Sequence, residues 1–149
     1  EIQMADLLRE VRRRFDFCLL DAPAGLGRGF QLATCAADRC VVVTTADASS
    51  LRDAQHTVME LDRFPSGALH LVVNRVRKKL LRQLHATIDD AIDKAGLPLL
   101  GVVPEDDALP LCMNRGVPIL LADGQSAATA YRNIAKRLQG ERVPLLRIR

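Results

Sequence analysis

The apolar residues of this chain are concentrated in four short runs, at residues 15–20, 40–45, 69–73 and 99–103. Each run is nearly continuous, whereas a strand with one face in water would alternate polar and apolar residues. Continuous apolar runs of this length are typical of strands that are buried on both faces of a parallel sheet. The pattern therefore predicts four buried strands.

Between these runs the apolar positions recur with helical spacing, which predicts helices over residues 2–14, 28–37, 50–63, 79–95, 105–115 and 126–139. Ser50 and Asp53 have the spacing of a capping box, and Gly96 and Gly140 are placed to end two of the helices. Strands that alternate with helices predict an α/β fold, a parallel sheet with helices on both faces. We expect a single domain over 1–149, in which 141–149 is a short basic tail.

The composition, 48% hydrophobic and 26% charged, excludes extended disorder. Only 3% of residues are aromatic, so the core has to be aliphatic. The four cysteines lack metal-site spacing, and Cys18 and Cys40 fall within predicted strands, which indicates reduced thiols and a cytoplasmic protein. No apolar stretch approaches the roughly 18 residues of a membrane span, and the first helix is amphipathic, unlike a signal peptide.

The net charge of +3 comes from basic clusters at residues 12–14, 75–79 and 142–149. Such clusters can contact phosphates, lipid head groups or an acidic partner, although most charge runs are solvated helix faces. No aromatic residues are interleaved with them, so the sequence does not predict a nucleic-acid partner.

Ligands of open parallel sheets bind beyond the carboxyl ends of the strands. Asp21 follows the first run, where a carboxylate can hold Mg²⁺ directly or through water. Gly25 can present its N–H to a phosphate oxygen because no side chain obstructs the approach, and Pro23 stiffens the loop between them. The alternative is that Asp21 caps the turn and that Pro23 and Gly25 only shape it.

Polar residues also follow the third and fourth runs. The amide of Asn74 offers a donor and an acceptor, as an adenine edge requires, but loop asparagines are commonly turn residues. Glu105, Asp106 and Asp107 precede a helix, where carboxylates meet the helix dipole favourably. The three histidines show no ligand spacing. The glycines at 25–29 fail the dinucleotide pattern, because Phe30 stands at the third glycine.

Taken together, these segments resemble the MinD branch of the MinD/ParA ATPases. The similarity runs from about residue 7 to 138 and is carried by FDFCLLDAPAG at 15–25, ADRCVVVTT at 37–45, SSLRDA at 49–54, LVVNR at 71–75, GVVPED at 101–106 and NRGVP at 114–118. The first resembles that family's Walker B strand and switch II. LVVNR and GVVPED resemble its two adenine-contacting loops. The segment at 49–54 is particularly like the MinD branch.

The resemblance implies a P-loop NTPase fold and an ATP-dependent dimerising switch that places the division site. It implies ATP and Mg²⁺ as cofactors, with Asp21 in the magnesium shell and Gly25 sensing the γ-phosphate. Asn74, Pro104 and Asp106 would frame the adenine, with Arg75 and Glu105 beside it. It further implies a homodimer on ATP, cell-division regulatory partners, and a cytoplasmic protein that associates peripherally with the inner face of the membrane.

The sequence departs from the family in three ways. No G-x-x-x-x-G-K-[ST] is present, so we expect the C-terminal part of such an ATPase, incomplete at its N-terminus and unable to hydrolyse ATP alone. Gly27 stands where the MinD pattern has an acidic residue. Pro144 interrupts the tail, which argues against a membrane-targeting helix there.

Three other functions fit parts of the pattern. A ParA-like DNA partition ATPase would use the basic clusters, and a non-catalytic partner-binding module would keep the scaffold without the nucleotide. A metal-cluster protein would need cysteines in loops, whereas Cys18 and Cys40 fall within predicted strands. Without a neighbouring P-loop strand, we expect residues 15–20 to be unpaired at one edge or to pair with 40–45.

Overall fold

The computed structural model describes residues 2–65, 67–83, 87–122 and 126–146, except for the side chains of Ile2 and Lys78. Its helices are α1 (Ile2–Arg14), α2 (Arg28–Thr34), α3 (Ala48–Met59), α4 (Lys78–Gln83), α5 (Ile88–Ala95), α6 (Ala108–Asn114) and α7 (Ser126–Leu138), with a 3₁₀ turn η1 (Ile119–Leu121). Its strands are β1 (Cys40–Thr44), β2 (Leu69–Val76) and β3 (Leu99–Pro104). None of the helices within these ranges is both long and apolar enough to cross a membrane.

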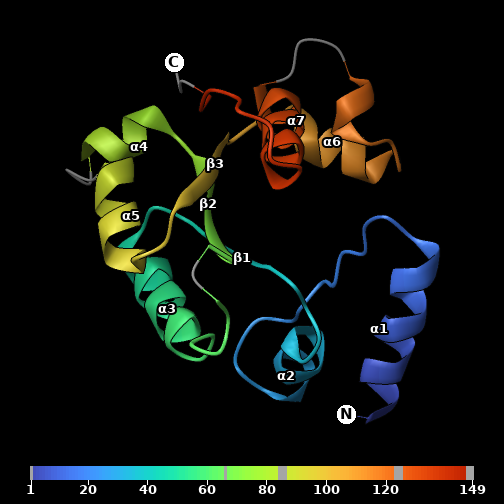
Figure 1. Ribbon diagram of the computed structural model, residues 1–149. Coiled ribbons are helices and arrows are strands. Elements are labelled where there is room, and N and C mark those ends of the chain that lie inside the picture. The colour runs from blue at the N-terminus through green and yellow to red at the C-terminus, as the bar shows by residue number, and fades with distance from the viewer. Residues whose placement is uncertain (1, 66, 84–86, 123–125, 147–149) are drawn as a thin grey trace.

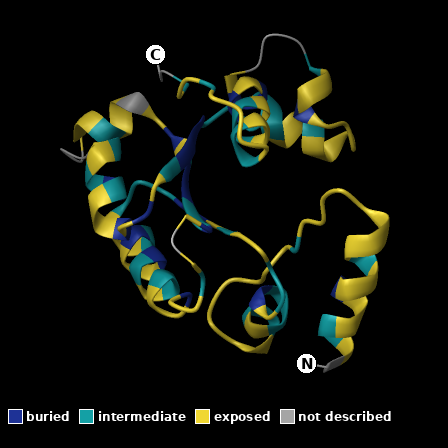
Figure 2. Cartoon of the chain, in the orientation of Figure 1, coloured by how far each residue is buried: buried dark blue, intermediate teal, exposed yellow. Residues whose placement is uncertain are grey.

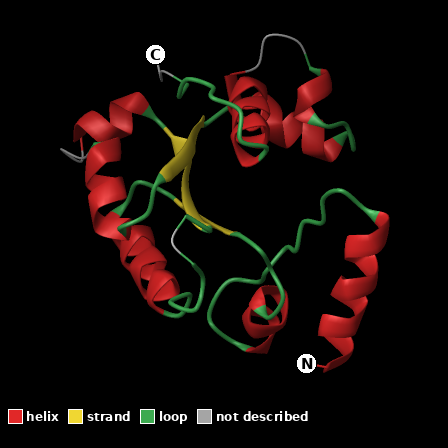
Figure 3. Cartoon of the chain, viewed as in Figure 1, coloured by secondary structure: helices red, strands yellow, loops and turns green. Residues whose placement is uncertain are grey.

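The three strands form a parallel sheet in the order β1-β2-β3. Helices α3 and α5 lie on one side of this sheet and α7 lies on the other (Figure 1). Figure 3 shows the same layers with the strands between the helices. The predicted α/β class, a parallel sheet with helices on both faces, is therefore confirmed.

Two apolar clusters hold the layers together. On the α3 and α5 side, Leu51 and Ala91 pack against Leu71 and Val73 of the central strand, all of them buried. On the α7 side, small residues of the helix, such as Ala127, pack against β2 and β3. Aliphatic side chains supply this core, as the low aromatic content predicted.

The segment at 15–20 is the main difference from the predicted fold. It is an extended stretch that pairs with no described strand, so the prediction of a buried strand here is wrong, as is the alternative that it pairs with 40–45. Phe15, Phe17 and Leu19 are 64%, 68% and 90% exposed (Figure 2). Cys18 is exposed as well. An apolar run predicts burial, but it becomes a strand only where a neighbouring strand takes up its hydrogen bonds.

Two predicted helices also change. The helix predicted at 79–95 is two helices, α4 and α5, because Thr87 is extended and caps α5 through a capping box with Asp90. Gly96 ends α5 in the left-handed conformation, as predicted. The capping box predicted for Ser50 and Asp53 is wrong: α3 begins earlier, and its N-cap is Asp47, whose carboxylate accepts the Ser50 N–H at 3.0 Å.

Candidate functional site

The carboxyl end of β2 carries the first polar group of the site. Asn74 is half-buried, and its Oδ1 accepts the N–H of Arg75 at 2.9 Å. None of the side-chain hydrogen bonds between described residues uses the amide nitrogen of Asn74, so both of its donors are available to a ligand.

Arg75 has an unusual backbone. Its φ is +53°, a left-handed conformation that, among the described residues other than glycine, is found at this position alone. The register of β2 against β3 is irregular at the same point, between Val73 and Val76. Such a conformation costs energy in an arginine and is concentrated at functional sites. The strand was predicted to end at Val73, but it continues to Val76 and is interrupted by a strained bulge at Asn74 and Arg75.

The carboxyl end of β3 is joined to this bulge by Glu105. Its backbone N–H donates to the carbonyl of Val76 at 3.1 Å, which continues the ladder one residue past Pro104. The side chain of Glu105 is 20% exposed, and its carboxylate forms ion pairs with Arg75, at 3.2 Å, and with Arg77. Glu105 thus fixes the positions of both arginines at the tip of the sheet.

Asp106 connects the tip of β3 to two helices. One oxygen accepts the Ala108 N–H of α6 at 3.1 Å. The other accepts the Ala127 N–H and the Ser126 hydroxyl of α7, at 3.2 Å and 3.4 Å. These contacts account for both carboxylate oxygens, so Asp106 acts first as a cap that places α6 and α7.

The tip of β1 carries Asp47, a residue that the sequence patterns did not single out. The hydroxyl of Thr45 donates to its carboxylate, and together with the N–H of Ser50 this lowers the pKa of Asp47 to about 2. The signal that could have identified it is an aspartate three residues before Ser50, directly after an apolar run. Its bonds make it the start of α3 rather than a free ligand.

The loop at 21–27 is open. Asp21 is exposed and forms no hydrogen bond or ion pair with another described residue. Gly25 has φ of +87°, and a Cβ added there would meet nothing within 4 Å. Pro23 lies against α2, because a Cβ on Gly29 would be 2.5 Å from its ring. Proline therefore anchors the loop while Asp21 and Gly25 stay accessible.

The structure thus brings together, at the carboxyl end of the strands, Asn74, Arg75, Pro104, Glu105 and Asp106. Among the described residues, no hydrogen bond or ion pair joins the loop at 21–25 to them. Within the described ranges, no group of three or more His, Cys, Asp or Glu is arranged to hold a metal ion. These residues present amide donors, arginines and carboxylates at one end of the sheet, but they do not by themselves form a magnesium site or a closed phosphate cradle.

The sheet and its helices have the fold of the MinD and ParA P-loop NTPases of known structure. The model of one family, described as "Cellulose biosynthesis protein BcsQ", matches residues 2–138, and the chain belongs to this family within the MinD/ParA group. This confirms the resemblance that the sequence motifs carried.

The chain is also similar to proteins that carry the name MinD. The chain is 37% identical over 145 residues to the septum site-determining protein MinD of Bacillus subtilis, an alignment that covers 96% of this chain and 54% of the relative. It is 33% identical over 147 residues to MinD of Synechocystis, covering 97% and 55%. The chain therefore spans about half the length of the curated relatives it matches.

Solved structures show the same similarity. The MinD cell division protein of Aquifex aeolicus superimposes with a TM-score of 0.91 at 30% identity, over 98% of this chain and 63% of that one. The MinC:MinD complex from the same organism gives 0.90 at 30% identity, over 98% and 62%. MinD of Pyrococcus horikoshii, solved with Mg-ADP, gives 0.78 at 25% identity, over 91% and 55%.

Proposed function

We propose that this chain contributes the base-binding and switch II loops of a MinD-type ATPase, an ATP-dependent dimerising switch in division-site placement. The observation that carries the proposal is the arrangement at the tip of β2. There a strained bulge in the strand presents the free amide donors of Asn74, and Glu105 holds the neighbouring Arg75. An asparagine amide in such a position can pair with the edge of an adenine.

The proposed roles follow from the positions of the residues. Asn74 and Pro104 frame the adenine with Arg75 beside it, while Asp106 fixes the loop through its two helix caps. In the longer protein, the accessible Asp21 lies in the magnesium shell and the N–H of Gly25 faces the γ-phosphate. The Mg-ADP bound to the Pyrococcus horikoshii relative supports ATP and Mg²⁺ as cofactors.

The proposed partners are a second copy of the protein, brought together by ATP, and cell-division regulators. The MinC:MinD complex of Aquifex aeolicus supports the second kind of partner. The proposed location is the cytoplasm, with peripheral attachment to the inner face of the membrane. Pro144 makes residues 141–149 a poor interfacial helix, so we do not assign the attachment to this segment.

The test is calorimetry of Mg-ATP binding, run on this chain and on the same chain together with whatever residues precede it in its gene. We expect binding in the extended form and no ATP hydrolysis by the 149-residue chain, because its sequence contains no G-x-x-x-x-G-K-[ST]. Asn74→Ala in the extended form should weaken binding about tenfold, the loss of one or two hydrogen bonds to a buried base. Asn133→Ala, on α7, is the matched control.

Either of two results would overturn this proposal. ATP hydrolysis by the 149-residue chain would contradict the expectation that hydrolysis requires the G-x-x-x-x-G-K-[ST] loop, which this sequence lacks. No binding by a folded extended form would instead favour an interaction module on an ATPase scaffold.

The description of the matching family favours a second candidate, a role in cellulose biosynthesis by the same nucleotide switch. The two functions share the fold and the site, so binding experiments do not separate them. Deletion of the gene does: misplaced septa would support the division function, and loss of cellulose with normal septa would support the second.

A further inference from the structure

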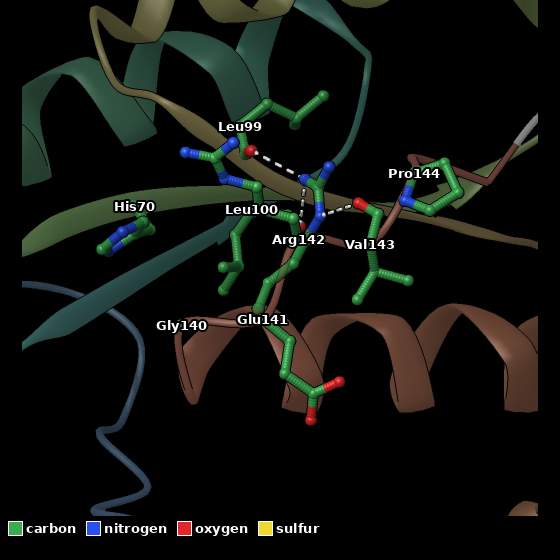
Figure 4. A pocket seen from close by; sticks show the side chains of 9 residues that line it. His70, Leu99, Leu100, Gly140, Glu141, Arg142, Val143 and Pro144 are labelled. Atoms are coloured by element: carbon green, nitrogen blue, oxygen red, sulfur yellow. Dashed lines mark hydrogen bonds between the residues drawn. The ribbon is translucent and has the colours of Figure 1, made fainter.

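A hollow lies at the amino ends of β2 and β3, at the opposite end of the strands from the candidate base site. Its volume is about 520 Å³. Its walls come from the starts of the two strands, from Arg137 of α7, and from the segment that follows α7: His70, Leu99, Leu100, Arg137 and residues 140–144. Figure 4 shows His70 on one side of the hollow and Val143 and Pro144 on the other.

His70 supplies an unsatisfied polar atom to this wall. Its Nδ1 is buried, and within the described part of the chain it has no hydrogen-bond partner. Buried polar atoms are nearly always paired, and each exception calls for an explanation such as a ligand or a water. A group in the hollow that accepts a hydrogen bond can satisfy this nitrogen once the atoms that cover it move aside.

The segment after α7 is folded back over the strand ends by a specific turn. Gly140 has φ of +88°, and the N–H groups of Gly140 and Glu141 donate to the carbonyls of Arg137 and Lys136, each at 3.0 Å. This pair of bonds is a Schellman motif, which ends the helix and satisfies its last carbonyls. It places Arg142 in the wall of the hollow.

The charge of this wall is positive. The guanidinium of Arg137 donates to three carbonyls, those of Val143 at 2.9 Å, Leu100 at 3.0 Å and Leu99 at 3.3 Å. Neither Arg137 nor Arg142 forms an ion pair with any acidic residue in the described ranges. The one carboxylate in the wall, that of Glu141, points away from the strand ends (Figure 4).

We propose that this hollow binds a small oxyanion, a phosphate or carboxylate group of a soluble compound. The anion displaces the atoms that cover Nδ1 of His70 and accepts a hydrogen bond from it, and Arg142 forms the charge-assisted bond. Arg137 adds its uncompensated positive charge and holds residues 140–144 in place through its three bonds to carbonyls. The site is distinct from the proposed base site, which lies at the other end of the strands, and it does not rest on the proposed function.

The experiment is a titration of the full-length protein with inorganic phosphate and, separately, acetate, followed through the imidazole nitrogen resonances. The His70 signal should move and saturate, while that of His56, exposed on α3, should not. A larger response to phosphate or to acetate identifies which oxyanion the site takes. Because the signal comes from His70 itself, phosphate bound at a nucleotide site does not imitate it.

The variant Arg142→Gln should weaken the anion affinity by about tenfold, as expected for the loss of a hydrogen bond to a charged group. Arg142 is exposed, so this change leaves the core intact. Arg52→Gln, an equally exposed arginine on α3, should leave the affinity unchanged. A His70 signal that does not saturate with either anion would mean that the hollow holds only water. An affinity that Arg142→Gln does not alter would mean that the anion binds without Arg142, and either result would overturn the proposal.

Discussion

At the scale of single residues, Gly101 sets the distance between the sheet and α7. A Cβ built on this glycine of β3 would be 2.4 Å from Cγ1 of Ile134 and 2.8 Å from its Cδ1. Non-bonded carbon atoms do not approach each other this closely. The helix can therefore lie so near the strand only because Gly101 has no side chain. The close approach in turn buries Ala127 and Ala130 against the sheet.

Gly101→Ala should therefore destabilise the protein by about 1–3 kcal/mol, the usual cost of an extra methyl in a packed core. Urea unfolding followed by circular dichroism measures the change. Gly27→Ser is the control: a Cβ at Gly27 meets nothing within 4 Å, its φ is an ordinary −75°, and serine suits its N-cap position before α2. An equal loss of stability in both variants would contradict this account of Gly101.

Asp47 should make stability depend on pH below the neutral range. The hydroxyl of Thr45 and the N–H of Ser50 lower its pKa from 3.8 to about 2 in the folded protein. The stabilisation is thus fully present above the unfolded pKa and is lost as the pH falls toward the folded value. Asp47→Asn keeps a cap but cannot titrate, so its free energy of unfolding should vary less than that of the wild type between pH 5 and pH 3.

The measurement is a series of urea midpoints over that pH range. Asp89→Asn, at an exposed position in the first turn of α5, controls for the change in net charge. If Asp47→Asn follows the same pH profile as the wild type, Asp47 is not the group responsible.

At the scale of elements, the tip of β3 organises the helices around it. Asp106 receives N–H groups from α6 and from α7, although Ala127 is 21 residues further along the chain. The loop predicted to bind the base is thus also the point where the α7 layer is attached to the sheet. A change in this loop should affect both stability and ligand binding.

Asp106→Ala removes both helix caps, and we expect it to lower the free energy of unfolding by about 1–2 kcal/mol. Asp107→Ala is the neighbouring control, because Asp107 is exposed and its side chain forms no cap bond to α6. Thermal unfolding of the two variants measures the difference. Near-equal melting temperatures would show that the caps of Asp106 contribute little.

At the scale of the whole molecule, most apolar residues of the central strand are buried, whereas several of those in β1 and in the extended stretch at 15–20 are exposed to solvent. Leu71 and Val73 of the central strand are fully buried, but Val43 of β1 is 60% exposed and the extended stretch with Phe17 and Leu19 lies open to solvent. Apolar patches of this kind favour association with another surface. The edge of β1 that faces away from β2 also pairs with no described strand.

The 149-residue chain should therefore self-associate, and Leu19→Lys should raise the concentration at which this begins several-fold. Sedimentation velocity measures the association. Met59→Lys, at the end of α3 and outside the extended stretch, should have little effect; Met59 is 71% exposed. A monomeric wild-type chain at all accessible concentrations would contradict the prediction.

Much of this architecture could be predicted from the sequence. The runs at 40–45, 69–73 and 99–103 correspond to strands, and the ends of α5 and α7 at Gly96 and Gly140 agree with prediction, because such signals are local. The order of motifs also predicted the family, since the tips of parallel strands carry the site residues. The binding roles of all the predicted site residues, Asn74 and Asp106 as well as Asp21 and Gly25, stay predictions, because no contact of the structure tests them.

The sequence by itself thus determined the class of fold, the apolar clusters and the residues at the strand ends, because periodicity and turn chemistry depend on near neighbours along the chain. Only the tertiary structure decided that residues 15–20 form no strand, that Asp47 rather than Ser50 caps α3, and that Asp106 joins two helices. It also decided that the Nδ1 of His70 has no partner among the described residues and that His70 lines the same hollow as Arg137 and Arg142. Each of these outcomes depends on which groups meet in space, and contacts between residues far apart in sequence leave no local pattern from which they could be predicted.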